Sequence, residues 1–296
     1  MITSYLIAIS IISLIYLLLT IGLNLHYGFT GLINFGHVGF FAIGAYTSAI
    51  LALSGVPVWL SFPAAMGAAG LAAIPIGALS LRLRIEYFAI VTLGFSEAVR
   101  LMITEERWLT NGVQGIPGIP DLAVATGIPL DAATLTFLAL IAANAIAVAA
   151  SYRLVKSPFG RAIEAIRDDE DAMKALGKNP GGFKVRVFVI GAALAGLGGA
   201  FYAHYITYIS PDQFLPLLTF YIWMAMILGG VGRVSGAVVG TFVLVLFLEG
   251  SRFLRDVVPG VSEVEMASLR LFVVGVALVL LVLYRPQGIM GDFSKR

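Results

Sequence analysis

Residues 2–23 read ITSYLIAISIISLIYLLLTIGL and contain no charged side chain. A helix needs about 20 apolar residues to cross roughly 30 Å of hydrocarbon, because every backbone N–H and C=O group must be paired inside the segment. The stretch is too long for the apolar core of a signal peptide, and no basic residue precedes it. We therefore expect a retained transmembrane helix here.

The same criterion finds eight further apolar runs along the chain. They lie at residues 30–53, 58–80, 86–104, 132–152, 184–208, 214–231, 235–255 and 267–284. Because each run is long enough to span a bilayer as a helix, the predicted fold is an all-α polytopic membrane protein. It has about nine transmembrane helices in a single domain over residues 1–296.

The composition supports a membrane protein and excludes several other classes. Apolar residues make up 59% of the chain and charged residues 12%, whereas soluble domains have about 45–50% and about 25%. The net charge of +2 gives no attraction to a polyanion, so nucleic acid is not an expected partner. Cysteine is absent and the three histidines are far apart in sequence, which argues against disulfides, thiol chemistry and a metal site.

The orientation follows from the basic residues, because short cytoplasmic loops are enriched in Lys and Arg. The segment 153–186 holds eight of the nineteen: Arg153, Lys156, Arg161, Arg167, Lys174, Lys178, Lys184 and Arg186. We therefore place this loop in the cytoplasm. Counting helices outward from it puts the C-terminus in the cytoplasm, and it puts the N-terminus and the long loop 105–131 outside.

The cytoplasmic loop contains a predicted amphipathic helix of about five turns. Ser157 and Pro158 are typical of a helix start, and Gly177 is typical of a helix end. Apolar residues recur mostly at three- and four-residue steps between them: Ala162, Ile163, Ala165, Ile166, Ala172, Met173 and Leu176. The helix either lies on lipid headgroups or docks its apolar ridge into a groove on a soluble partner. Its many acidic residues favour docking, because lipid-binding helices are rich in Lys and Arg.

Several stretches resemble a known family. The run from Gly160 to Gly177, GRAIEAIRDDEDAMKALG, resembles the cytoplasmic coupling loop of ABC importer permeases, with its loose EAA…G pattern. The similarity is closest to permeases for branched-chain amino acids of the LivM type. It extends to NFGHVGFFAIGAYTSAIL (34–51), YFAIVTLGFSEAVRL (87–101), LTNGVQGI (109–116) and LGGVGRVSGAVVG (228–240). The last stretch departs from the family pattern, because Ala237 stands where a proline is typical.

The resemblance implies a channel-forming subunit that is not itself an enzyme. No GxxxxGK[ST] phosphate loop occurs in the chain, so ATP and Mg²⁺ are expected on two separate ATPase subunits, with no cofactor on this chain. Other implied partners are a LivH-type permease, with a homodimer as the alternative, and an external amino-acid-binding protein at a prokaryotic inner membrane. The residues implied in ATPase coupling are Arg161, Glu164, Ala165, Arg167, Asp168, Asp169 and Gly177.

Polar residues inside predicted spans are candidates for the translocation pathway, because lipid does not satisfy them. Glu97 and Arg100, like Glu249 and Arg252, are spaced i,i+3 on one helix face, where each pair either neutralises itself or meets a zwitterionic solute. The candidate pathway residues are Asn34, His37, Tyr46, Glu97, Arg100 and Glu249.

Small residues indicate where helices approach closely. Glycines at 28, 31, 36, 39 and 44 favour close packing of the second span, with a broken helix lining a cavity as the alternative. Gly191, Ala195 and Gly199 form a second small face, directed at another span or at a second permease chain.

The leading functional hypothesis is therefore the permease subunit of an ATP-driven importer for hydrophobic amino acids, working by alternating access. A permease of the same family for urea or short amides remains open. An ion-coupled secondary transporter would explain the hydrophobicity, but it would not need a loop that resembles an ATPase-coupling loop. An intramembrane enzyme is disfavoured, because no GxSxG or HExxH motif occurs in the chain.

Overall fold

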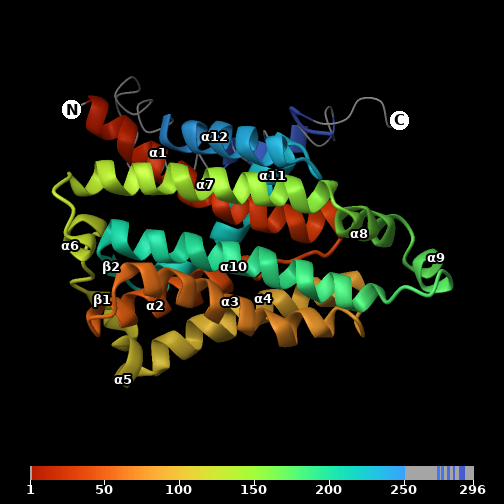
Figure 1. Cartoon of the computed structure of the whole chain (residues 1–296), viewed down its shortest axis with the longest axis horizontal. Coiled ribbons are helices and arrows are strands. Elements are labelled where there is room, and N and C mark those ends of the chain that lie inside the picture. Colours follow the sequence, from red (N-terminus) through yellow and green to blue (C-terminus); the bar gives the residue numbers. More distant parts are fainter. Residues whose placement is uncertain are drawn as a thin grey trace.

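The computed structural model describes residues 2–250, together with 272, 273, 275, 276, 279, 280, 283 and 287–290. In this part of the chain, long helices lie side by side in one bundle (Figure 1). The short helices α8 (Pro158–Asp168) and α9 (Glu170–Ala175) lie at one end, and the two-residue strands β1 (Ile116–Pro117) and β2 (Tyr208–Ile209) lie at the other. These are called the α8–α9 end and the β1–β2 end below.

The bundle helices follow the predicted apolar runs. They are α1 (Ile2–Asn24), α2 (His37–Leu53), α3 (Val58–Leu79), α4 (Ile85–Glu105), α7 (Ala132–Lys156), α10 (Pro180–Ile206), α11 (Leu217–Gly229) and α12 (Val234–Gly250). Within the described residues, six helical segments are long and apolar enough to cross a membrane, whereas α2 and α12 are shorter. The prediction of an all-α chain with many spans is confirmed for the described residues. The predicted span 267–284 lies mostly outside them.

The second predicted span is shorter than expected. We predicted a helix over residues 30–53, but α2 begins at His37, and a π-helical turn η1 (Leu25–Phe29) followed by irregular chain precedes it. Side chains satisfy the backbone in this break: the amide of Phe35 donates to Thr92 Oγ1 and that of Gly36 donates to Asn34 Oδ1. The apolar pattern alone did not reveal the break, because the bond to Thr92 comes from a residue far away in the sequence.

Helix α10 is central to the bundle and packs on α1, α2 and α3. Its glycines make these approaches possible. A Cβ added to Gly191 would collide with the His26 ring, and one added to Gly199 would collide with the Phe41 carbonyl. The small face predicted on this helix is therefore directed at spans of its own chain, and not at a second permease.

The loop 105–131 is folded onto the β1–β2 end. It contains α5 (Arg107–Thr110), η2 (Gly112–Gln114), β1 and α6 (Leu122–Thr126). Strand β1 pairs antiparallel with β2, with Ile116 opposite Ile209. Gly115 permits this pairing, because its φ is 70° and a Cβ would collide with the carbonyl of Ile209.

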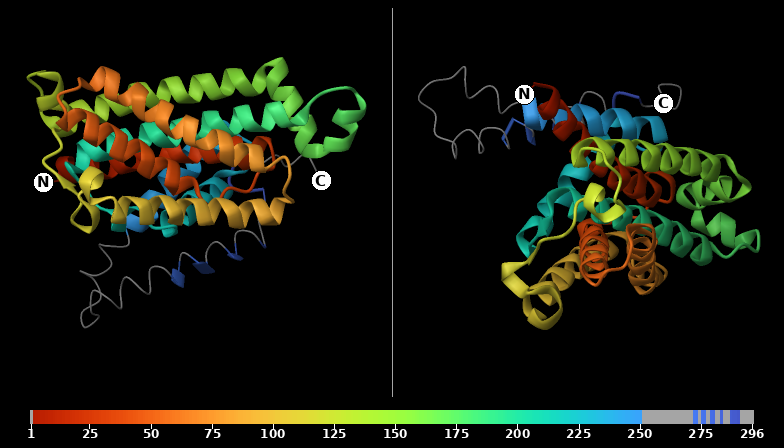
Figure 2. Two further views of the ribbon diagram at one scale, coloured as in Figure 1. Left: turned by 90° about the horizontal axis from the view of Figure 1, so that it is seen from below. Right: turned by 60° about the vertical axis from the view of Figure 1, so that its left-hand side comes forward.

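The single amphipathic helix predicted after Ser157 is in fact two. Ser157 caps α8 and Gly177 follows α9 with a φ of 72°, so both predicted boundary signals are confirmed. The chain becomes extended at Asp169, whose carboxylate accepts from the amide of Ala172 and starts α9. A competent N-cap inside the run therefore divides it. Figure 2 shows this pair extending beyond the ends of the long helices.

Candidate coupling and translocation sites

The apolar ridge of α8 faces its own bundle. Ile163 is fully buried and packs with Leu25 and Phe29 of η1 and with Val187 of α10. This corrects the prediction that the ridge inserts into a groove on a soluble partner. The ridge covers the π-helical turn because α8 connects α7 to α10 at the same end of the bundle as η1.

Arg167 joins α8 to the break between α1 and α2. Its guanidinium Nη1 donates to the carbonyl of Gly28 at 2.6 Å, while Nε and Nη2 donate to Asp168 at 3.1 and 3.0 Å. A π-helical turn leaves backbone carbonyls displaced from the regular α-helical pattern, and a charged donor binds such a carbonyl strongly. Arg167, predicted to contact the ATPases, is thus bonded to the backbone of its own bundle, although the residue stays partly accessible at the surface.

The remaining coupling candidates lie on or near the surface. Arg161, Asp168, Asp169 and Gly177 are exposed, and Glu164 and Ala165 are half-buried. Leu176 was assigned to the apolar ridge, but its side chain is 75% exposed. Its exposure follows from the division of the predicted helix at Asp169, which turns α9 away from the direction of α8.

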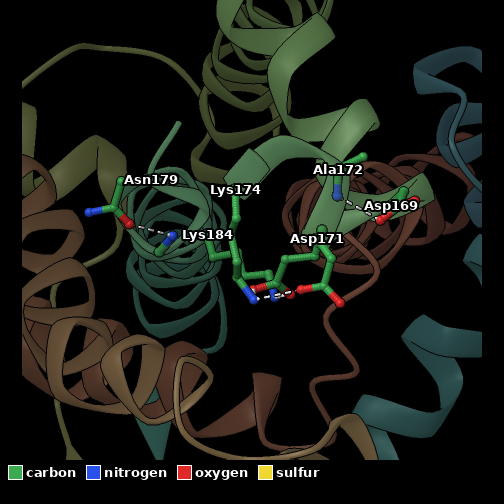
Figure 3. A network of polar contacts seen from close by, with 8 residues as sticks. Asp169, Asp171, Ala172, Lys174, Asn179 and Lys184 are labelled. Carbon is green, nitrogen blue, oxygen red and sulfur yellow. Dashed lines mark hydrogen bonds and ion pairs between the residues drawn. The ribbon is translucent and has the colours of Figure 1, made fainter. Parts of the chain in front are cut away.

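A salt bridge from Lys184 joins α9 to the start of α10, and Lys174 pairs with Asp171 inside α9 (Figure 3). Glu170 pairs with Lys184, which is 12% exposed, and with Lys174 at 3.3 Å. Burial alone would raise the pKa of Glu170, but the hydrogen bonds and charges of the two lysines outweigh burial and lower it. The Glu170–Lys174 spacing was visible in the sequence, whereas the approach of Lys184 depends on the fold.

A buried polar cluster fills the space beside the break. His26 Nε2 bonds to the carbonyl of Phe188 at 2.9 Å and His37 Nε2 to the carbonyl of Leu19 at 3.0 Å. A carbonyl only accepts, so each Nε2 must carry the proton and each Nδ1 is an acceptor. The Asn34 amide nitrogen lies 3.1 and 3.4 Å from these two Nδ1 atoms. Asn34 and His37 are fully buried and satisfied in this cluster, so their pathway role stays a prediction.

The other pathway candidates lie toward the β1–β2 end. Arg100 donates to Glu97 at 2.8 Å, and both side chains are partly exposed. The Tyr46 ring packs near Phe214, and its buried hydroxyl has no hydrogen-bond partner among the described residues. Glu249 is half-buried near the end of α12. Its predicted partner at position 252 lies outside the described residues.

Comparison with known proteins identifies the family. Residues 5–282 match the family model described as "Branched-chain amino acid transport system / permease component". The chain belongs to this family. It is 32% identical to the LivM permease of Escherichia coli over 95% of this chain and 69% of that protein. It is 27% identical to the LivH permease of the same organism over 93% and 91%, respectively. No solved structure matches the chain.

Contacts in the structure explain two of the family-like stretches of this branched-chain amino acid permease. In LTNGVQGI, the Thr110 hydroxyl donates to the carbonyl of Ile103, and the Asn111 amide donates to the carbonyl of Gly115. These bonds close the turn that leads into β1. In LGGVGRVSGAVVG, Ala237 stands where proline is typical, and it is fully buried in the first turns of α12. The helix starts at Val234 without the proline.

Proposed function

We propose that this permease is the membrane-spanning subunit of an ATP-driven importer for branched-chain and other hydrophobic amino acids. The names of its LivM and LivH relatives support this cargo and a pair of unlike permeases. The basic segment 153–186 supports a cytoplasmic α8–α9 end with the N-terminus outside. The LivM and LivH relatives from Escherichia coli support a prokaryotic inner membrane.

One observation supports the coupling mechanism best. Helix α8 is attached to the π-helical turn by the buried Ile163 and by the bond from Arg167 to Gly28. A rigid-body displacement of α8 by an ATPase would therefore move the junction of α1 and α2. The break beside this junction contains irregular backbone, which is tolerated at membrane depth where protein covers it or water fills a cavity. Alternating access then follows from movement of α1 and α2 against the rest of the bundle.

The partners follow from this assignment. Two ATP-binding subunits, which carry ATP and Mg²⁺, would bind the exposed side of α8 and α9, including Arg161, Asp168, Asp169 and the neighbouring Leu176. A LivH-type permease would complete the pathway, and an external amino-acid-binding protein would dock at the β1–β2 end. The pathway would involve residues among Asn34, His37, Tyr46, Glu97, Arg100 and Glu249.

A charge reversal tests the coupling surface. Asp168→Lys changes an exposed carboxylate outside the apolar spans, so the permease should still insert and fold. The variant places a positive charge where the proposed ATPase contact has a negative one, so the charges across the interface no longer match. The variant permease should therefore co-purify less well with its ATPases and stimulate ATP hydrolysis less. Glu106→Lys, an exposed reversal at the opposite end, is the matched control. Normal co-purification and full stimulation by Asp168→Lys would contradict the proposed surface.

The cargo is tested by uptake. Proteoliposomes that contain the complete transporter and its binding protein should accumulate leucine, isoleucine or valine when ATP is enclosed with the ATPases. Urea and acetamide are the comparison solutes for the alternative cargo within the family. Accumulation of urea without accumulation of leucine would reassign the substrate, and accumulation driven by an ion gradient without ATP would reject the importer.

A further inference from the structure

A small pocket near the β1–β2 end lies among residues that no motif singled out. Tyrosines contributed by three helices line it: Tyr16 of α1, Tyr202 of α10 and Tyr221 of α11. Asp212 and Gln213 of the short helix η3 (Pro211–Phe214) complete its polar part, and three leucines at the η3–α11 junction form an apolar wall. We call this site the tyrosine pocket. Its volume of about 200 Å³ is below the roughly 300–1,000 Å³ of sites for drug-sized ligands, so it suits a small solute.

The polar groups of the tyrosine pocket are incompletely satisfied. Asp212 is exposed and forms no ion pair with any described residue. The carboxamide oxygen of Gln213 is buried and has no hydrogen-bond partner within the described part of the chain. Buried polar atoms in folded proteins almost always have partners. An acceptor without one therefore points to a donor supplied by water or a ligand.

A basic side chain lies near the acid of the pocket. The guanidinium of Arg100 acts on Asp212 from α4, but Glu97 already binds it through two hydrogen bonds. The pocket thus combines the Asp212 carboxylate, an amide oxygen and three tyrosine side chains beside an apolar wall.

This combination matches one chemical class. Carboxylate and amide oxygens accept from an ammonium group, and tyrosine ring faces attract cations. Tyrosine hydroxyls also donate to a carboxylate. An aliphatic side chain would lie against the leucines. A small zwitterion with an apolar side chain uses all of these groups, whereas a neutral amide or a fatty acid leaves the Asp212 carboxylate without a cation.

We propose that the tyrosine pocket binds the ammonium group of an apolar amino acid on its way through the permease, with Asp212 and Gln213 as acceptors. The proposal rests on the proposed function, because it takes the cargo to be an amino acid. The pocket lies at the end of the bundle assigned to the outside. It would therefore hold the solute soon after release from the binding protein.

Cysteine protection tests the pocket directly, because the native chain has no cysteine. Leu217→Cys places a thiol on the pocket wall at a position that is 46% exposed. Leucine should slow its reaction with a maleimide in the complete transporter, whereas 4-methylpentanoate, which lacks the ammonium group, should not. Val113→Cys in η2 (Gly112–Gln114), exposed at the same end, is the matched control and should react equally with and without leucine.

Asp212→Asn in the Leu217→Cys background tests the acceptor. Loss of a charge-assisted hydrogen bond should weaken the apparent affinity for leucine by about tenfold or more, while the labelling rate without leucine stays the same. Because Asp212 is exposed, this variant should fold, and gel filtration checks that it does. Glu106→Gln is the control. It removes an exposed carboxylate just after the C-terminal end of α4, and it should leave the protection unchanged.

The outcomes separate the two proposals. Leucine uptake without protection of the pocket cysteine would overturn the pocket alone, and so would protection that 4-methylpentanoate reproduces or that Asp212→Asn retains in full. Protection by leucine without ATP-driven uptake would overturn the proposed function alone. Protection that requires both the ammonium group and Asp212, together with uptake, supports both.

Discussion

Replacing Ile163 by alanine tests whether α8 packs on its own bundle or requires a partner to cover its ridge. Ile163 has no exposed surface and packs with Leu25, Phe29 and Val187. Removing this much buried side chain costs about 2–5 kcal/mol. Helix α8 lies outside the apolar spans at the edge of the bundle, where neighbours relax more easily. We therefore expect the lower part of this range, about 2–3 kcal/mol.

Hydrogen exchange of the α8 amides measures this loss in the purified permease without ATPases. A decrease of about 2–3 kcal/mol in the free energy of local opening corresponds to exchange about 30- to 140-fold faster. Leu176→Ala is the control, because its side chain is 75% exposed. Surface substitutions usually change stability by less than about 0.5 kcal/mol, so exchange should stay within about twofold.

The same pair of variants separates stability from coupling. Leu176→Ala should leave α8 intact and reduce the ATPase stimulation, because Leu176 lies on the exposed surface assigned to the partner. If Ile163→Ala exchanges like the wild type in the isolated permease, the buried ridge is not a stabilising contact. The docking of α8 onto η1 would then be refuted.

Three further predictions concern the charges and the topology. Glu97→Gln and Arg100→Gln should each lower the folded yield, because the two side chains pair at 2.8 Å and each single variant leaves one charge without its partner. The double variant should recover both yield and uptake. A folded but inactive double variant would instead indicate contact with the solute. The pKa of Glu170 is lowered from 4.5 in the folded protein. The stabilising contribution of Glu170 is therefore present above pH 4.5 and is lost as the pH falls through the pKa of the folded state. The difference in unfolding temperature between the wild type and Glu170→Gln should disappear in acid. Gln114→Cys should react with an impermeant maleimide on intact cells, and Lys178→Cys should react only after permeabilisation; the reverse pattern would invert the orientation.

Local chemistry was sufficient to predict several of the helices. A run of apolar residues long enough to cross a bilayer must pair its backbone internally, so α3, α4, α7 and α10 lie close to their predicted positions. The boundary signals at Ser157 and Gly177 also act through neighbouring residues in the chain, and both are confirmed. The spacing of Glu97 and Arg100 predicted their pairing for the same reason.

Tertiary structure decided where these helices break and what their faces contact. The late start of α2 depends on a hydrogen bond from Phe35 to Thr92, far away in sequence, and the burial of Ile163 depends on where the chain returns as α10. The tyrosine pocket likewise gathers residues from α1, α10, η3 and α11. Hydrophobicity along the chain indicates how much apolar surface must be removed from water or placed in lipid. It does not specify which neighbour covers that surface, because apolar contacts are non-directional and only the packed bundle selects among them.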